Sequence, residues 1–283
     1  MLEGSFELML EETLRVIEAQ RDSNGSINHD LVEIAVPERL AIVGDLHGDL
    51  QTLEKILNEL DSTGFLEDRN SKLIFLGDYI DRGKNSVGVL YTLFKLICDF
   101  PDGVILMKGN HEAPLQFPFR QHDFPAKMQA EFFRGRELYL RTLSIFDLLP
   151  VATVVTDELL LVHGGLPRIE DLENARKILS LAGEQKKVVE EILWNDPREL
   201  GTEQSWEKSR RSYGVHFGRP VTNAWIRALG VKAVVRGHEP SPGFSITHDG
   251  KILTLFSCRE SYPSYGAAFI SASKQELEAL KNA

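Results

Sequence analysis

The sequence predicts an α/β fold, and two observations support this prediction. Short apolar runs alternate with helical patterns between residues 39 and 107, which is typical of β-α-β units with neighbouring parallel strands. The glycines that follow three of these runs, Gly44, Gly77 and Gly109, are 33 and 32 residues apart, about the length of one such unit. The chain of 283 residues is long enough for one large domain of this kind.

The elements are expected in a regular order along the chain. An amphipathic helix should occupy residues 5–21, followed by a polar, turn-rich linker at 22–30. The predicted strands lie at 40–43, 73–76, 104–107, 151–155, 159–162, 231–235, 244–247, 252–256 and 267–270, with helical patterns at 50–60 and 87–97. Two of the connections, 156–158 and 248–250, have the composition of hairpin turns. Ser273 and Glu276 have the spacing of a capping box and should open a short last helix.

These elements divide the chain into three predicted segments. Residues 1–35 form an N-terminal helix and linker, 36–272 form the main domain, and 273–283 form a short C-terminal helix. The composition shows no break between residues 35 and 272, so the main domain is expected to fold as one unit.

Composition and charge exclude several classes of partner. The net charge of −10 argues against a broad nucleic-acid surface, which requires an excess of basic residues. No stretch approaches 18 apolar residues, and the N-terminus lacks the pattern of a signal peptide. The two cysteines, Cys98 and Cys258, form no disulfide framework. We therefore expect a cytoplasmic protein without a nucleic-acid or membrane partner.

Polar residues follow the apolar runs at the points where the predicted strands end. Asp45 and His47 follow the first run, Asp78 follows the second, and Asn110 follows the third. Because the carboxyl ends of neighbouring parallel strands meet at one edge of a sheet, these four side chains should lie close together. The strand ends therefore predict a ligand site at this edge.

Two histidines, His163 and His238, follow later apolar runs in the same way. Oxygen ligands mixed with imidazole suit divalent Mn, Fe or Zn, whereas Ca and Mg prefer oxygen alone. The complete set is large enough for two ions that share one bridging carboxylate. Asp45 and Asp78 could instead cap the helices that follow them. Five strand ends with the same residue types favour the metal site.

At these residues the chain resembles a known family. Residues 44–48 (Gly-Asp-Leu-His-Gly), 77–83 (Gly-Asp-Tyr-Ile-Asp-Arg-Gly) and 109–112 (Gly-Asn-His-Glu) are similar to the signature of calcineurin-like metallophosphoesterases, and within them to the phosphoprotein phosphatase family of Ser/Thr phosphatases. Further motifs follow in the family's order at 149–152, 163–166, 193–197, 217–218, 236–239 and 255–257, so that the resemblance covers about residues 38–270. It implies a central β-sandwich flanked by helices, with a dimetal site at the carboxyl ends of the strands.

The resemblance also implies a role for each matching residue. Asp45, His47 and Asp78 would hold the first metal, and Asp78 would bridge to a second metal that Asn110, His163 and His238 complete. His111 and Asp81 match the acid pair, and Arg82, Arg211 and Tyr262 match the groups that bind the substrate phosphate. The spacing around Tyr262 departs from the family pattern, and Arg210 is an alternative to Arg211.

The implied reaction is the hydrolysis of a phosphomonoester by a hydroxide that bridges the two metals. His111, supported by Asp81, would protonate the leaving group. The cofactors would be two divalent ions, with Mn expected in vitro and Fe or Zn as the alternatives. The substrate would be a phosphorylated protein or peptide. The catalytic domain would span residues 36–272. Whether a regulatory protein partner exists is left open.

Two other functions remain as alternatives. A dinucleoside polyphosphate hydrolase, of the symmetrical diadenosine tetraphosphatase kind, would share the metal core, but such enzymes typically lack an acid at the position of Asp81. A catalytically silent scaffold on the same fold would be expected to have lost a metal ligand, whereas all six positions are filled here.

Two features have both a structural and a functional interpretation. Asp196 either caps a turn or supports the metal ligands. The third motif is followed by phenylalanines that either line a substrate groove or belong to the core, namely Phe117, Phe119, Phe124, Phe132 and Phe133.

Overall fold

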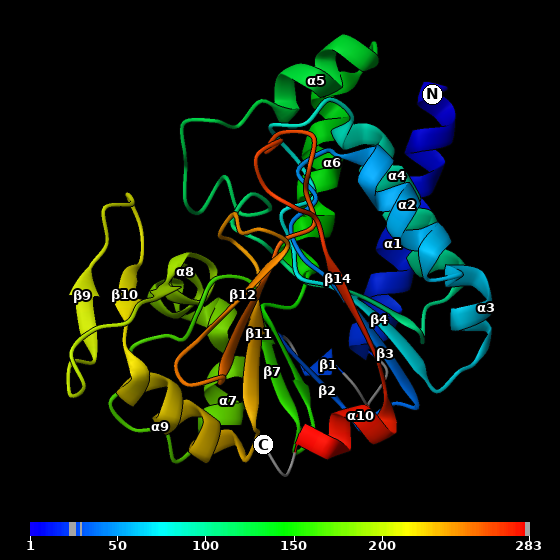
Figure 1. Ribbon diagram of the computed structural model, residues 1–283. Helices are drawn as coiled ribbons and strands as arrows, with labels where there is room; N and C mark the ends of the chain where they lie inside the picture. Colours follow the sequence, from blue (N-terminus) through cyan, green and yellow to red (C-terminus); the bar gives the residue numbers. More distant parts are fainter. Residues whose placement is uncertain (23–26, 29, 281–283) are drawn as a thin grey trace.

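The computed structural model describes residues 1–22, 27–28 and 30–280. Two sheets pack against each other at the centre of the molecule, with helices on both outer sides (Figure 1). The space between the sheets is filled by apolar side chains from both, including Ile42 and Ile74 from one sheet and Leu161 and Val235 from the other. The predicted β-sandwich flanked by helices is therefore confirmed.

The smaller sheet contains the strands of the predicted β-α-β pattern. Its order is β14 (Phe269–Ser273), β3 (Arg39–Val43), β4 (Ser71–Phe75) and β5 (Val104–Leu106). Strands β3, β4 and β5 are parallel, as the β-α-β pattern predicts, and β14 pairs antiparallel with β3.

The larger sheet is mixed. Its order in the described residues is β1 (Ile27–Asn28), β2 (Leu31–Ile34), β6 (Ala152–Val155), β7 (Leu159–Val162), β11 (Ala233–Arg236), β13 (Ile252–Leu255) and β12 (Phe244–Thr247). The pairs β6–β7 and β12–β13 are the two predicted hairpins. Strand β11 lies parallel to both β7 and β13, so these three strands end at the same edge.

The helices cover the outer sides of the two sheets (Figure 1). Beside the smaller sheet lie α1 (Glu3–Asp22), α2 (Leu50–Glu59), α3 (Ser62–Glu67), α4 (Ser86–Asp99) and α6 (Gly135–Leu148). Beside the larger sheet lie α7 (Ala175–Ser180), the 3-10 turn η1 (Ala182–Glu184), α8 (Lys186–Trp194) and α9 (Arg219–Leu229). Helix α5 (Phe124–Glu131) lies at one end of the molecule (Figure 1). Helix α10 (Lys274–Ala279) begins with the predicted capping box.

Several features differ from the sequence-based expectations, and helices α3 and α5 to α9 were not among the predicted elements. The last strand begins at Phe269 rather than at residue 267. A small sheet of β8 (Asp196–Pro197), β10 (Val215–Phe217) and β9 (Trp206–Lys208) was not predicted, because its strands are too short to show a period of two. The N-terminal segment is more than a helix and linker, since β2 pairs with β6 inside the larger sheet. Residues 23–26 and 29 of the predicted linker lie outside the described residues.

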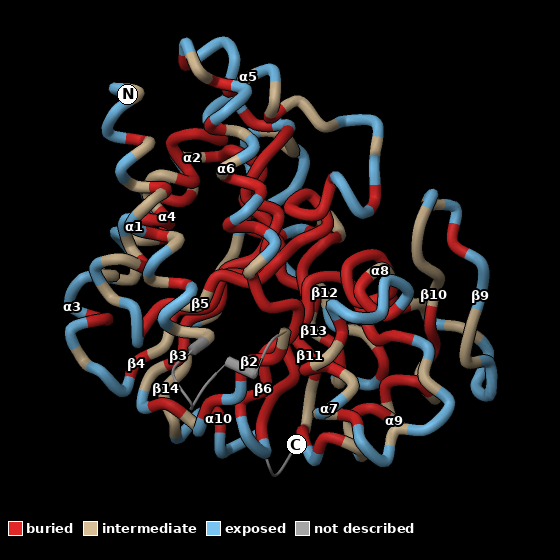
Figure 2. Tube along the Cα trace, turned by 180° about the vertical axis from the view of Figure 1, so that it is seen from behind, coloured by how far each residue is buried: buried red, intermediate tan, exposed pale blue. Residues whose placement is uncertain are grey.

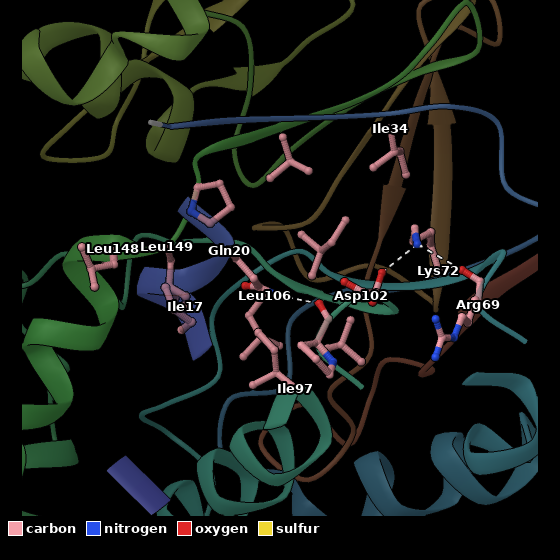
Figure 3. A pocket seen from close by; sticks show the side chains of 15 residues that line it. Ile17, Gln20, Ile34, Arg69, Lys72, Ile97, Asp102, Leu106, Leu148 and Leu149 are labelled. Atoms are coloured by element: carbon pink, nitrogen blue, oxygen red, sulfur yellow. Dashed lines mark hydrogen bonds between the residues drawn. The ribbon is translucent and has the colours of Figure 1, made fainter. Parts of the chain in front are cut away.

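The end of α1 lies beside the edge of the smaller sheet, next to a cavity of about 360 Å³. Figure 3 shows Ile17 and Gln20 of α1 near Leu106 of β5 and Leu149, with Lys72 at the opposite side. The lining is mainly aliphatic. It contains none of the predicted metal or phosphate ligands, so this cavity is separate from the predicted site.

Burial is greatest along the strands and the loops that follow them (Figure 2). Exposed residues are concentrated in peripheral segments such as residues 201–204 and β9 (Figure 2). Among the described residues, no helix combines the length and the apolar character needed to cross a membrane.

Helix α1 is expected to contribute strongly to stability. Phe6 is fully buried and stacks on Phe132, with 5.1 Å between the ring centroids. Phe6→Ala should lower the free energy of unfolding by about 3–5 kcal/mol, because it leaves a cavity in the core. Denaturant unfolding measures this loss, with Leu8→Ala on the exposed side of the same helix as the control. Equal stability of the two variants would mean that the packing of Phe6 against the domain contributes little to the free energy of unfolding.

Candidate metal centre and active site

The ends of three parallel strands of one sheet and two parallel strands of the other bring the predicted residues to one place. Asp45 and His47 follow β3, and Asp78 follows β4. Asn110 follows β5, while His163 and His238 follow β7 and β11 of the other sheet. All six side chains are buried. The site therefore lies where the carboxyl ends of strands from the two sheets meet.

The backbone at this edge adopts conformations that most residues avoid. His47, Asp78 and His238 have φ values of 43°, 57° and 70°, in the left-handed region. Such strain is retained where surrounding contacts determine the geometry, and it is typical of functional sites. A Cβ atom on Gly109 would overlap the amide nitrogen of Asp78. This glycine is therefore needed for the close approach of the loops after β4 and β5.

The capping alternative for the two aspartates is excluded by the helix ends. The N-cap of α2 is Asp49, whose side chain accepts a hydrogen bond from the Thr52 amide at 3.0 Å. The N-cap of α4 is Asn85, whose side chain accepts from the Gly88 amide. Asp45 and Asp78 cap neither helix.

The first group of donors surrounds His47. The Nδ1 atom of His47 lies 3.1 Å from the Ile80 carbonyl oxygen, which can only accept, so Nδ1 carries the proton. The Nε2 atom then points a lone pair toward Oδ2 of Asp45 at 3.7 Å and Oδ2 of Asp78 at 3.5 Å. Burial lowers the pKa of His47 to about 3, so its ring is neutral near pH 7. Three electron-pair donors thus converge around a space that suits a cation.

Asp45 supports the same conclusion. Its Oδ1 atom accepts a hydrogen bond from the amide of His238 at 2.8 Å, whereas its buried Oδ2 has no hydrogen-bond partner among the described residues. Burial, together with the nearby charge of Asp78, raises the pKa of Asp45 to about 6. A buried carboxylate oxygen without a donor is costly, and a metal ion at this position would offset the cost.

The second group of donors surrounds Asn110. Its Oδ1 atom lies 3.0 Å from Nε2 of His163 and 2.8 Å from Nδ1 of His238. Nδ1 of His163 faces the Leu76 carbonyl oxygen at 2.9 Å, which turns Nε2 toward Asn110 and toward Oδ1 of Asp78 at 3.3 Å. A second-shell contact of this kind is typical of histidines that bind metals.

The field at His163 is negative, whereas burial and the charge of Arg211 hold the pKa of His238 well below its usual range. Burial alone would lower the pKa of His163, but the carboxylate of Asp78 raises it to about 8. Burial also opposes ionisation of Asp78, yet His163 and His111 hold the pKa of Asp78 well below its usual range. Because a negative field that attracts a proton also attracts a cation, the residues present fit a divalent ion on this side as well.

Within the described part of the chain, two sets of three residues bring ligand atoms within 4.8 Å of one another: His47, Asp78 and His111, and Asp78, His163 and His238. Asp78 belongs to both sets, which is the arrangement expected of a bridging ligand. His111 occurs in the first set in addition to the predicted ligands.

His111 is held between two partners on the loop after β4. Its Nδ1 atom lies 2.6 Å from Oδ2 of Asp81, and its Nε2 atom lies 3.2 Å from an amino group of Arg82. Asp81 is fully buried. Burial raises its pKa, but hydrogen bonds from His111 and His122 outweigh this effect and hold the pKa of Asp81 well below its usual range. Asp81 is therefore a carboxylate that can orient an imidazole ring.

A cleft of about 780 Å³ opens over the predicted site, and Arg82, His111 and Arg211 line it. Arg211 donates from Nε to Asp196 at 2.8 Å, whereas Arg210 is exposed and lies outside the set of lining residues. The structure thus brings Arg211, rather than Arg210, to the predicted site.

Tyr262 lies close to both Arg82 and His47. Its ring centroid is 6.0 Å from that of His47, and the guanidinium carbon of Arg82 lies 5.6 Å from the Tyr262 ring centroid. A neighbouring cleft of about 610 Å³ is lined by both Arg82 and Tyr262. Tyr262 is therefore close to the first group of donors despite its unusual spacing in the sequence.

The phenylalanines after the third motif divide between core and cleft. Phe117, Phe124 and Phe132 are buried in the core, and Phe133 is fully exposed. Phe119 lines the cleft and packs on His111, with 4.3 Å between ring centroids.

Two buried charged side chains, Glu112 and Arg236, hold the loops of the site in place, and their roles were not recognised from the sequence. The Glu112 carboxylate accepts from the amides of Asp78 and Gly109 at 2.7 and 3.0 Å and thereby ties two functional loops together. Arg236, also fully buried, donates to Asp196 at 2.8 Å. Asp196 therefore connects Arg236 to Arg211 rather than capping a turn. Both supports occur inside recognisable motifs, but only burial distinguishes them from surface charges.

Arg211 is expected to contribute to phosphate binding. Arg211→Ala should lower kcat/KM about 10- to 200-fold on a phosphomonoester, because charge-assisted hydrogen bonds to the phosphate are lost. Steady-state kinetics measures this change, and Arg210→Ala is the matched control with an expected change of less than about twofold. If the Arg210 variant loses more activity than the Arg211 variant, the assignment is reversed.

Comparisons with known proteins agree on one family. A family model described as calcineurin-like phosphoesterase matches residues 38–242. A probable serine/threonine-protein phosphatase of Encephalitozoon cuniculi is 34% identical over 230 residues, which are 80% of this chain and 48% of the relative. Serine/threonine-protein phosphatase 5 of Solanum lycopersicum is 32% identical over 80% of this chain and 40% of its own length. The chain thus spans less than half the length of these relatives.

Solved structures show the same fold. A protein serine/threonine phosphatase from Saccharomyces cerevisiae superposes with a TM-score of 0.74 at 22% identity, over 92% of this chain and 79% of that one. A putative diadenosine tetraphosphatase superposes with a TM-score of 0.50 at 18% identity, over 86% of this chain and 93% of that one.

Proposed function

Since the chain belongs to the calcineurin-like phosphoesterase family, we propose that it is a metal-dependent protein serine/threonine phosphatase. The observation that carries this proposal is the pairing of His111 with the buried Asp81 at 2.6 Å, beside Arg82 and next to the donors around Asp78. The names of the relatives support protein substrates, while the substrate of this chain is part of the proposal.

Two divalent cations are proposed at the six donors. Asp45, His47 and Asp78 would hold the first ion, and Asp78, Asn110, His163 and His238 would hold the second. Bound there, two divalent ions would acidify a water molecule and screen the negative charge of the phosphate. We propose Mn as the ion that supports activity in vitro, with Fe or Zn as the alternatives.

His111 is proposed as the general acid. A serine or threonine alkoxide is a poor leaving group, so the P–O bond breaks readily only when the departing oxygen receives a proton. Asp81 accepts a hydrogen bond from Nδ1 of His111, which leaves Nε2 to deliver that proton. The products are the free hydroxyl side chain and inorganic phosphate, because water supplies the oxygen that replaces the leaving group.

Arg82 and Arg211 are proposed as phosphate ligands, with Tyr262 beside Arg82. In the structure Arg82 donates to Nε2 of His111, which must therefore carry a lone pair in this state. A bound phosphate would accept the hydrogen bond of Arg82 instead and leave His111 Nε2 free to be protonated. Two guanidinium groups can each bind phosphate oxygens in a forked arrangement that lysine does not reproduce.

The extent and location of the protein are proposals as well. The catalytic domain is proposed at residues 36–272, completed by β2, which pairs with β6 of the larger sheet, and by α1, which packs on α4 and α6. A cytoplasmic location is proposed because both cysteines, Cys98 and Cys258, are free thiols.

The proposal is tested with purified protein and a panel of substrates in the presence and absence of Mn. Phosphoserine and phosphothreonine peptides should release phosphate in the presence of Mn and not after chelation. Diadenosine tetraphosphate serves as the competing substrate. Faster hydrolysis of diadenosine tetraphosphate would replace the proposal with a dinucleoside polyphosphate hydrolase, and no hydrolysis of either substrate would favour a scaffold.

A further inference from the structure

His122 is a second histidine on the carboxylate of the proposed acid pair. It lies in the loop before α5, and its Nδ1 atom is 3.0 Å from Oδ2 of Asp81. His111 contacts the same oxygen at 2.6 Å. The His122 side chain is 15% exposed, so it is largely enclosed by its neighbours.

The protons on these two rings follow from the state of Asp81. As a carboxylate it only accepts hydrogen bonds, so both Nδ1 atoms must donate to it. His122 thus helps to fix the same oxygen of Asp81 that His111 contacts. The other oxygen, Oδ1, accepts from the amide of Phe124 at 2.8 Å. Three donors from two segments therefore hold the carboxylate in one orientation.

His122 is itself anchored by α6. Its Nε2 atom lies 2.9 Å from the hydroxyl of Tyr139, and Phe119 packs on its ring with 5.4 Å between the centroids. Phe119 also packs on His111. The hydrogen-bonded chain Tyr139–His122–Asp81–His111 thus runs from the half-buried Tyr139 of α6 to the proposed general acid.

We propose that His122 is a positioning residue for His111, acting through Asp81, with Tyr139 holding His122 in place. This inference rests on the proposed function, because it deepens the role of the same acid pair. Without His122, the Asp81 carboxylate loses one of two donors on Oδ2 and can rotate. The hydrogen bond from Nδ1–H of His111 would then be weaker. The imidazole ring would be less well oriented, so that Nε2 would transfer its proton to the leaving group less efficiently.

The effect should depend on the leaving group. His122→Leu removes the donor, whereas His122→Asn retains an N–H donor near the position of Nδ1. On a phosphoserine peptide, kcat should fall about 10- to 100-fold in the Leu variant, the range typical of supporting residues around a site. On 4-nitrophenyl phosphate, whose leaving group needs no proton, the fall should be less than about threefold. His122→Asn should restore most of the lost rate.

The experiment measures kcat and KM of these variants, of Tyr139→Phe and of His216→Leu on both substrates, with bound Mn determined for each. His216 lies on β10 beside Glu207 and serves as the matched control. Equal losses on the two substrates, or full activity of His122→Leu on the peptide, would overturn the inference.

A second measurement separates this inference from the proposed function. Inactivity of the unmodified protein on all phosphomonoesters would refute the function alone. Nitrogen-15 NMR of the histidine side chains would then decide the role of His122. The Nδ1–H signal of His111 should broaden in His122→Leu and sharpen again in His122→Asn. An unchanged His111 signal in the Leu variant would refute the positioning role.

Discussion

Asp78→Asn is expected to abolish both metal binding and hydrolysis. Asp78 presents Oδ2 to His47 at 3.5 Å and Oδ1 to His163 at 3.3 Å, so it faces both groups of donors. Asparagine has nearly the same shape and tolerates the φ value of 57°, but it removes the shared negative charge. Because loss of a supporting residue already costs 10- to 100-fold in metal affinity, loss of the bridging ligand should cost at least about 100-fold.

Metal content, thermal unfolding and turnover measure this effect together. Added Mn should raise the Tm of the unmodified protein and leave the Tm of Asp78→Asn nearly unchanged, because a ligand stabilises only a state that binds it. Asp99→Asn is the control, since Asp99 is a partly exposed carboxylate paired with Lys95. Full metal occupancy and turnover in the Asp78 variant would show that Asp78 is not the bridging ligand.

His111→Asn is expected to lower turnover of a phosphoserine peptide by about 100- to 10,000-fold, the usual contribution of a general acid. Asp81→Asn should produce a similar loss, because the amide cannot accept from Nδ1 of His111 as a charged group does. Bound metal should remain unchanged in both variants. The loss should be much smaller on 4-nitrophenyl phosphate, because that leaving group departs without a proton.

Metal analysis gives this experiment a second outcome. His111 lies within ligand distance of His47 and Asp78, so the structure also permits a ligand role for it. Loss of metal from His111→Asn would assign His111 as a ligand, and normal turnover would exclude it as the acid. His216→Asn controls for the removal of an imidazole elsewhere in the domain.

The strands and the residues after them could be predicted because their signals are local. Apolar runs of four or five residues ending in glycine and a polar residue identify β3, β4 and β5. Parallel pairing then brings Asp45, Asp78 and Asn110 to one edge. The strands β8, β9 and β10 have only two or three residues and contain no such apolar run, so the sequence did not predict them.

The supports of the site could not be predicted, because they depend on contacts between distant segments. Arg236 reaches Asp196 across 40 residues, and His122 reaches Asp81 across 41. Arg236 ends a strand inside a recognisable motif, and His122 lies in a loop. Because charged residues and lone histidines are usually solvated, the sequence does not show that either side chain is buried against a carboxylate. The choice of Arg211 over Arg210 likewise depends on which side chain faces the cleft.

The sequence by itself indicated the fold family through the resemblance of its motifs, and it predicted six metal donors in the segments that follow strands. The same resemblance implied the His111–Asp81 pair. The tertiary structure decided how these groups are held. It directs the lone pair of His47 Nε2 toward two carboxylates. It also buries Arg236 in a hydrogen bond with Asp196 and places His122 within hydrogen-bond distance of Asp81. The physical reason is that hydrogen-bond direction and burial depend on the packing of segments far apart in the chain, which no local pattern encodes.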